Sequence, residues 1–205
     1  IDLSGWAGID TMNFNGTFPV LEELLIGRTD DNLTTLSLGS SLPGLKKLTL
    51  RKHSVIKNLD LSGCTLLENV DLSGCTSMTE ATLPDGCPLT ALHLPASFTA
   101  LTLKGMPDIT TDGITFDAIA AIKRLRVENC ANISGFDIVE KILNTTGNNL
   151  AYLRITGINT SGDGTILKTI YNNKIGGITS DSLPVNGSCA LSGTYQLTKY
   201  MEDSL

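Results

Sequence analysis

The amino-acid sequence predicts a solenoid, in which short coils stack along one axis and contribute parallel strands. Three observations lead to this fold class. An apolar-x-x-apolar-x-apolar pattern recurs along most of the 205 residues, aromatic residues make up only 5% of the chain, and the phrase D-L-S-G-C-T occurs twice. Self-similarity at a near-constant spacing is the sequence signature of repeat architectures. The low aromatic content indicates a core of small aliphatic side chains, which is typical of an architecture whose layers repeat.

The recurring pattern supplies the strands of the predicted coils. The middle apolar residues of alternate copies recur every 20 to 28 residues, which is the length of one coil in solenoids of this type. The copies in between fall on the opposite side of the early coils, so each early coil carries two short strands. The first set is Met12, Leu36, Leu59, Ala81, Leu101, Leu125 and Leu153, and the second set is Ile1, Leu24, Leu48, Val70 and Leu92.

The later coils differ, because the second strand is missing from the pattern. Segments with a helical apolar stripe take its place at 115–122 and 135–146, and a third such segment follows the last strand at 163–173. Ser134 and Asp163 stand where a polar side chain can cap a helix. The predicted fold is therefore an α/β solenoid over residues 1–175, with two-strand coils first and strand–helix coils toward the C-terminus.

The last thirty residues, 176–205, break the repeat. Gly, Ser, Asn and Pro dominate 176–193, and "GTYQLTKY" then alternates like a strand. Because a solenoid needs its exposed end covered, we expect this tail to cap the C-terminal end or to begin a further domain. The chain opens on "IDLSGW", in the middle of a repeat, so we expect it to be a piece of a longer polypeptide.

Specific motifs resemble a known family. The spacing L-x-x-L-x-L-x-x-C at 56–64 and 122–130 resembles leucine-rich repeats. Leu-Pro follows one strand of a coil at 83–84 and 94–95, and Gly-Cys follows the other, which is similar to bacterial surface proteins of the BspA-like type, although the Ala-Phe dipeptide of that family is missing. The resemblance implies a noncatalytic interaction or adhesion module of a bacterial surface or secreted protein, at the cell surface or outside the cell.

A second resemblance points to another class of function. Similar repeat modules that end in a Gly-rich stretch and a short strand look like parts of gut-phage and prophage tail proteins. That resemblance implies a structural spacer in a virion, where a uniform polar surface needs no ligand. Both readings stay open at this point.

The cysteines fit a structural role. Cys64, Cys75 and Cys130 each stand three residues after the last apolar residue of a strand, where a small side chain points inward at the turn. No C-x2-4-C spacing is present, so the sequence predicts buried thiols and no zinc site. Cys87 falls one residue later, and Cys189 lies outside the repeat and is the one candidate for an exposed thiol.

Composition and motifs also limit the possible functions. The net charge of −6 argues against a nucleic-acid partner, which needs a basic surface. No apolar run is long enough for a membrane-spanning helix within this segment. Phosphate-binding loops, metal motifs and nucleophile–base arrangements are also missing from the sequence. We therefore expect no enzymatic activity, no cofactor and no catalytic residues.

One group of outward strand positions stands out as a candidate binding site. In a strand, alternate residues face opposite sides, and the early outward positions are short and polar. The last rows change to a basic and aromatic set, which is typical of binding hot spots. The set is Lys104, Arg124, Arg126, Tyr152 and Arg154, and a protein or glycan partner is expected. The alternative is that these charges pair with Glu128 or are simply solvated, and Lys47, Thr49, Arg51 and His93 form a weaker counterpart on the other face.

Overall fold

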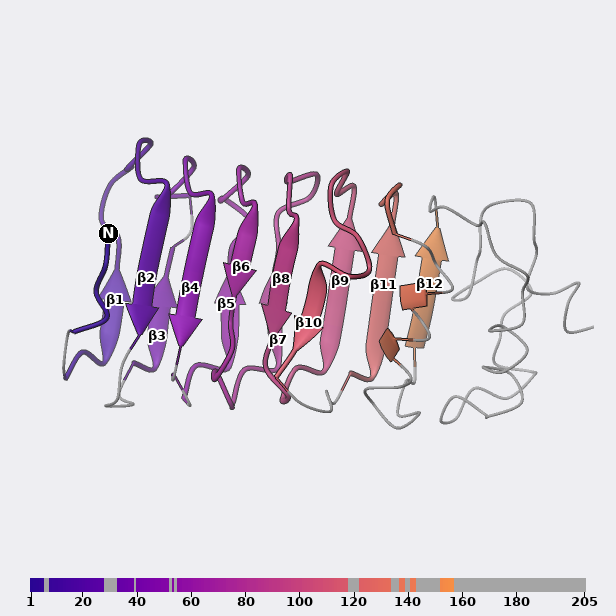
Figure 1. The fold of residues 1–205 in the computed structure, drawn as a ribbon. Helices are drawn as coiled ribbons and strands as arrows, with labels where there is room; N and C mark the ends of the chain where they lie inside the picture. Colours follow the sequence, from indigo (N-terminus) through magenta and orange to yellow (C-terminus); the bar gives the residue numbers. More distant parts are fainter. Residues whose placement is uncertain are drawn as a thin grey trace, which may run out of the picture.

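The chain folds into a β-solenoid of parallel strands, described here from a computed structural model (Figure 1). The prediction of a solenoid with parallel strands is confirmed. The structure describes residues 1–5, 8–27, 33–38, 40–51, 53, 55–117, 122–133, 137–138, 141–142 and 152–156. The predicted helix at 163–173 and the tail at 176–205 lie outside these residues.

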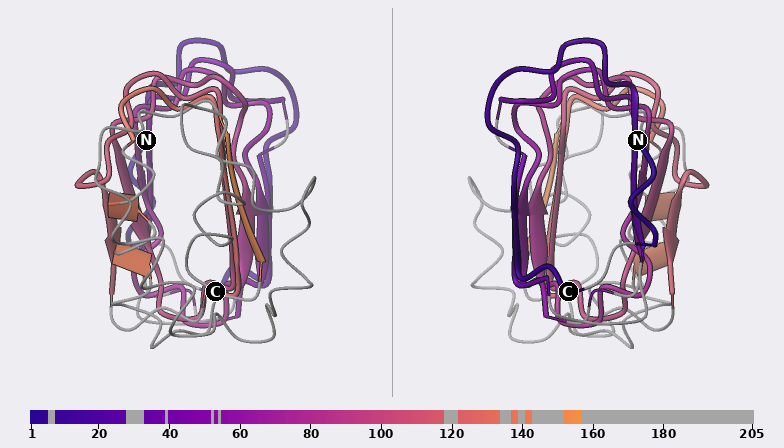
Figure 2. Two further views of the ribbon diagram at one scale, coloured as in Figure 1. Left: turned by 90° about the vertical axis from the view of Figure 1, so that its right-hand side faces the viewer. Right: turned by 90° about the vertical axis from the view of Figure 1, so that its left-hand side faces the viewer.

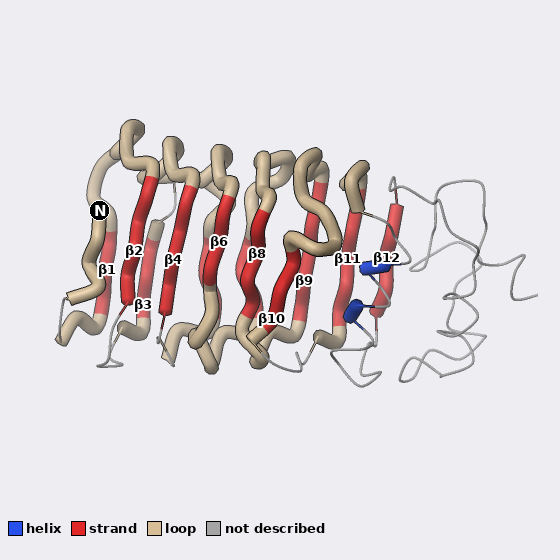
Figure 3. Tube along the Cα trace, viewed as in Figure 1, coloured by secondary structure: helices blue, strands red, loops and turns tan. Residues whose placement is uncertain are grey.

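Twelve short strands build the described part of the solenoid. They are β1 (Thr11–Asn13), β2 (Glu23–Gly27), β3 (Thr35–Ser37), β4 (Lys47–Arg51), β5 (Asn58–Asp60), β6 (Asn69–Asp71), β7 (Glu80–Thr82), β8 (Ala91–Leu94), β9 (Ala100–Lys104), β10 (Ile114–Phe116), β11 (Arg124–Glu128) and β12 (Tyr152–Thr156). Figure 3 shows the strands joined by loops along one axis.

The strands form two walls, which the end-on views of Figure 2 show facing each other across the core. One wall is a single sheet in the order β10-β8-β6-β4-β2. The opposite wall is divided into three sheets, β1-β3, β5-β7 and β9-β11-β12. We call the first the continuous wall and the second the divided wall. Successive strands of one wall belong to successive coils, because the chain alternates between the walls.

The strand register matches the two predicted sets of apolar residues. Except for the ladder of β10 with β8, every ladder pairs members of one set with each other, so these coils are in the alignment that the repeat spacing predicted. The pairs are Met12↔Leu36, Leu59↔Ala81, Leu101↔Leu125 and Leu125↔Leu153 on the divided wall, and Leu24↔Leu48, Leu48↔Val70 and Val70↔Leu92 on the continuous wall. Ile1 extends the second set, because Asp2 forms a parallel bridge with Leu25.

The predicted helix at 115–122 is wrong in the part that the structure describes. Residues 114–116 form strand β10, which pairs with β8 through Ile114↔Leu92 and Phe116↔Leu94. The side chain of Ile114 is fully buried. Ile114 continues the row of Leu92, and its side chain is stabilised more by packing beside Leu92 in the sheet than it would be in a helix at this position. Of the predicted segment at 135–146, residues 137–138 and 141–142 are helical.

Stacked rows of aliphatic side chains fill the space between the two walls. The buried residues of the strands are mostly Leu, Ile and Val that are less than a tenth exposed, for example Leu48, Leu50, Leu92 and Leu103. Fully burying one such side chain contributes roughly 1.5–3 kcal/mol. Because each row continues from coil to coil, the described residues share one hydrophobic core.

The phrase D-L-S-G-C-T builds a turn at the end of a strand. The Asp60 carboxylate accepts a hydrogen bond from the Ser62 backbone N–H at 2.9 Å, and Asp71 accepts one from Ser73 at 3.0 Å. Such local bonds favour a turn over a longer strand. In the second copy, Gly74 has a φ of 76°, a conformation that glycine adopts without strain. The Cys that follows then points into the core.

Candidate functional site

The register of three strands brings the predicted basic and aromatic positions together on the divided wall. Lys104 ends β9, Arg124 and Arg126 lie on β11, and Tyr152 and Arg154 lie on β12. Arg124 pairs with Tyr152 and Arg126 with Arg154 in the parallel ladder. The five positions therefore occupy neighbouring rows of one sheet. The side chains of β12 lie outside the described part of the chain. We call this set the basic–aromatic patch.

Two cations of this patch form ion pairs within the chain. The Arg126 guanidinium lies 2.8 Å from Oε2 of Glu128, a carboxylate that is 92% buried as a side chain, and Lys104 pairs with Asp85. The pairing with Glu128 was the alternative that the sequence left open. It fixes the direction of the Arg126 side chain, which keeps 41% of its surface exposed. The exposed part of this side chain is on the surface of the wall, where a partner can contact it.

The three cysteines singled out in the sequence are all inside the core. Cys64, Cys75 and Cys130 are fully buried free thiols, as is Cys87. The Cys75 thiol donates a weak hydrogen bond to the Leu50 carbonyl in the preceding coil at 3.6 Å. Burial, together with the nearby Asp60 charge, raises the pKa of Cys64 to about 11. Such thiols are poor nucleophiles, which agrees with a structural role. Cys189 lies outside the described residues.

His53 takes the same position in its turn as these cysteines. It stands three residues after the buried Leu50 of β4, as Cys75 stands three residues after Leu72. Its ring is almost fully buried, and Nε2 donates a hydrogen bond to the Ile26 carbonyl of the preceding coil at 3.1 Å. Sequence analysis did not identify this role. The signal was available, because the spacing from the last strand residue is the same.

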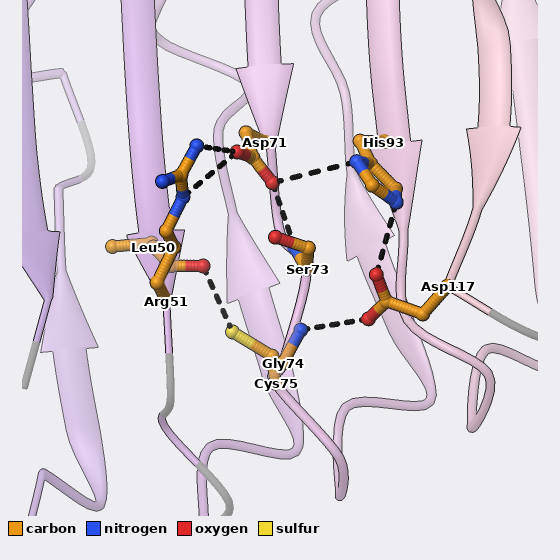
Figure 4. Close-up of polar contacts among 8 residues, drawn as sticks. All are labelled: Leu50, Arg51, Asp71, Ser73, Gly74, Cys75, His93 and Asp117. Atoms are coloured by element: carbon orange, nitrogen blue, oxygen red, sulfur yellow. Dashed lines mark hydrogen bonds and ion pairs between the residues drawn. The ribbon is translucent and has the colours of Figure 1, made fainter. Parts of the chain in front are cut away.

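The continuous wall carries a chain of polar contacts that crosses four coils (Figure 4). Arg51 on β4 donates to Oδ2 of Asp71 on β6 through Nε at 3.1 Å and Nη2 at 2.9 Å. His93 on β8 lies between two carboxylates, with Nδ1 3.8 Å from Asp71 and Nε2 2.9 Å from Asp117. The second oxygen of Asp117 accepts the Gly74 backbone N–H at 2.7 Å. We call these side chains the cross-coil network.

The electrostatics of the network are set by Asp71. Burial of its carboxyl opposes ionisation, but the hydrogen bonds from Ser73 and the Arg51 guanidinium outweigh this, and the pKa of Asp71 lies below its ordinary value. The side chain of Asp71 is only 15% exposed. An ionised carboxylate with this many donors is fixed in place, so the network ties consecutive coils together.

The sequence identified only the cationic half of this network. The repeat pattern places Arg51 and His93 on this wall with Lys47 and Thr49, but it singles out neither Asp71 nor Asp117. The direct ladder of Asp71 with His93 was implied by the predicted register, so Asp71 could have been found. Asp117 could not, because the sequence predicts a helix over 115–122.

The described residues offer no group of three or more His, Cys, Asp or Glu that could hold a metal ion. Within the same residues, no helix is both long and apolar enough to span a membrane. Scans of known protein families, curated proteins and solved structures found no match to this chain.

Proposed function

We propose that this chain is a noncatalytic interaction or adhesion module, which binds a protein or glycan partner through the exposed face of the divided wall. The observation that carries the proposal is the ladder that aligns Arg124 with Tyr152 and Arg126 with Arg154. On a rigid solenoid, these positions keep fixed distances from one another. A preorganised array loses less entropy when it binds.

The proposal includes a finer description of the repeat and its setting. The coils belong to the leucine-rich type, similar to BspA-like proteins, with strand–helix coils near the C-terminal end of the repeat. The module is part of a larger bacterial protein at the cell surface or outside the cell. Its sequence motifs support this description, together with the inward Cys64, Cys75 and Cys130, each of which stands three residues after the last apolar residue of a strand.

The experiment is a binding screen of the purified chain against host-cell surface proteins, matrix proteins and immobilised glycans. The variant Arg126→Glu/Arg154→Glu reverses two charges of the patch. The control Lys47→Glu/Lys57→Glu makes the same change in net charge at two exposed positions outside it. A partner that binds the parent and the control, but binds the patch variant about tenfold more weakly or worse, supports the proposal. Equal binding by all three proteins contradicts it.

A structural spacer of a phage or prophage virion is the second candidate. The ion pairs of Arg126 with Glu128, Lys104 with Asp85 and Arg51 with Asp71 favour it, since they satisfy charges within the chain. A spacer needs stiffness and solubility but no ligand. If the screen finds no partner, this candidate gains weight.

A further inference from the structure

The divided wall is interrupted between β3 and β5. The two strands belong to separate sheets, and no backbone hydrogen bond joins their described residues. Elsewhere on this wall, the residue that precedes a strand donates to the preceding coil, as Thr79 does to Lys57 at 2.9 Å and Thr99 to Thr79 at 2.8 Å. The edge of β3 that faces β5 therefore presents backbone N–H and C=O groups without a strand partner.

A groove of about 310 Å³ lies at this interruption. This volume is at the lower end of the range for small-ligand sites. The groove is lined by aliphatic residues at its base and by short polar or acidic residues from three strands. The lining residues are Leu36, Ser37, Leu38, Asn58, Leu59, Asp60, Glu80 and Thr82. We call this feature the β3–β5 groove.

The lining chemistry limits the kind of ligand that can bind. Two carboxylates, Asp60 and Glu80, line the groove without any Lys, Arg or His among the lining residues. The Ser62 backbone N–H lowers the pKa of Asp60, so this carboxylate is ionised at neutral pH. Anionic ligands, such as phosphates or acidic sugars, would meet uncompensated negative charge.

The backbone groups at the exposed strand edge favour a neutral, hydroxyl-bearing ligand over a cationic one. A basic side chain can only donate hydrogen bonds, so it satisfies carboxylates and carbonyls but leaves the N–H groups of a strand edge unpaired. A hydroxyl group both donates and accepts. Several hydroxyls on one ring can therefore satisfy the backbone edge, the Ser37 and Thr82 hydroxyls and the carboxylates together. The aliphatic base suits the C–H groups of such a ring.

We propose that the β3–β5 groove binds a neutral oligosaccharide. This inference rests on the proposed recognition role of the divided wall, but it uses different residues from the basic–aromatic patch. The ligand lies across the interruption, accepts and donates hydrogen bonds at the edges of β3 and β5, and is oriented by Asp60 and Glu80.

The test uses the whole chain and a panel of immobilised neutral oligosaccharides, namely gluco-, manno- and fully N-acetylated chito-oligosaccharides. Sialylated glycans and a lysine-rich peptide are the anionic and cationic arms. The variant Ser37→Leu/Glu80→Ala fills the groove and removes one carboxylate. Thr11→Leu is the matched control, because Thr11 is exposed on the same wall and does not line the groove. Circular dichroism and thermal unfolding verify that each variant is folded, and Glu80→Gln, a milder change, replaces the double variant if that one does not fold.

We expect at least one neutral oligosaccharide to bind, with binding about tenfold weaker or worse in the groove variant and unchanged in Thr11→Leu. Binding should change little with added salt, because the ligand carries no charge. No binding to any neutral oligosaccharide, preference for the lysine-rich peptide, or equal binding by the groove variant would each overturn the inference. The variant Arg126→Glu/Arg154→Glu, measured on the same panel, separates the two proposals, because it should retain groove binding even if the patch has no partner.

Discussion

The two copies of D-L-S-G-C-T end strands on opposite walls, and their side chains have different surroundings. In the first copy, the carboxylate of Asp60 bonds to Ser62 and lies beside the β3–β5 groove. In the second copy, Asp71 bonds to Ser73 in the same way and also receives the Arg51 guanidinium. The comparison shows that the phrase encodes the turn, whereas the neighbouring coils decide what else its polar residues do.

Among substitutions at matching positions of the two copies, we expect the largest difference in the free energy of unfolding at the glycine. Gly74 has a φ of 76°, whereas Gly63 is not among the residues with a positive φ. A Cβ in the left-handed region costs roughly 1–2 kcal/mol, so Gly74→Ala should lower the free energy of unfolding by that amount. Gly63→Ala is the control and should have a much smaller effect. Urea unfolding followed by circular dichroism measures both. Equal losses would mean that the two turns have the same conformation.

We expect a smaller difference in stability loss between the two copies when the aspartate is replaced. Asp71→Asn keeps an acceptor for Ser73 but removes the charge that Arg51 contacts, and we expect a loss of about 1 kcal/mol. Asp60→Asn is the matched control, because Asp60 is exposed and has the same local hydrogen bond. Its loss of stability should be smaller, because Ser62 alone lowers the pKa of Asp60 and no arginine contributes.

The pH dependence sharpens this second comparison. The folded-state pKa of Asp71 is lowered, so its contribution to stability is complete above the unfolded-state pKa of about 3.9 and is lost as the pH falls through the lower folded-state value. The stability gap between the parent and Asp71→Asn should therefore close in acid, as the pH falls through the folded-state pKa of Asp71. A gap that stays constant down to pH values at which Asp71 is protonated would show that the charge is not the cause.

Most of the architecture could be predicted from the sequence, because it depends on a pattern that the chain repeats many times. The rows of Leu48, Val70 and Leu92 stack in the predicted register, since shifting one strand by a single residue would turn its apolar side chains outward. The inward cysteines followed from the same spacing. These features need only local sequence and the periodicity of a strand.

The errors arose where long-range partners decide the outcome. Ile114 joins the β8 edge, although its segment has a helical stripe, because the row of Leu92 offers a place for one more strand. The interruption between β3 and β5 has no sequence signal that we can identify, since both strands fit the repeat. Pairing of the patch with Glu128 was an alternative in the sequence, and the ion pair with Arg126 shows that side-chain geometry decides between such alternatives.

The two copies should differ least at their cysteines, whose thiols we expect to be alkylated at similar rates. Cys64 and Cys75 are both fully buried, although their aspartates differ in surroundings. Since the pKa of Cys64 is raised to about 11, its thiol stays protonated at pH 8, and alkylation requires the coil to open first. In a Cys189→Ser background, iodoacetamide should therefore label both thiols slowly in native protein and rapidly in urea, as measured by peptide mass spectrometry. If Cys64 alone reacted at the rate of a free thiol, the coil beside the β3–β5 groove would open independently of its neighbour, and the two walls would differ in local stability as well as in hydrogen bonding.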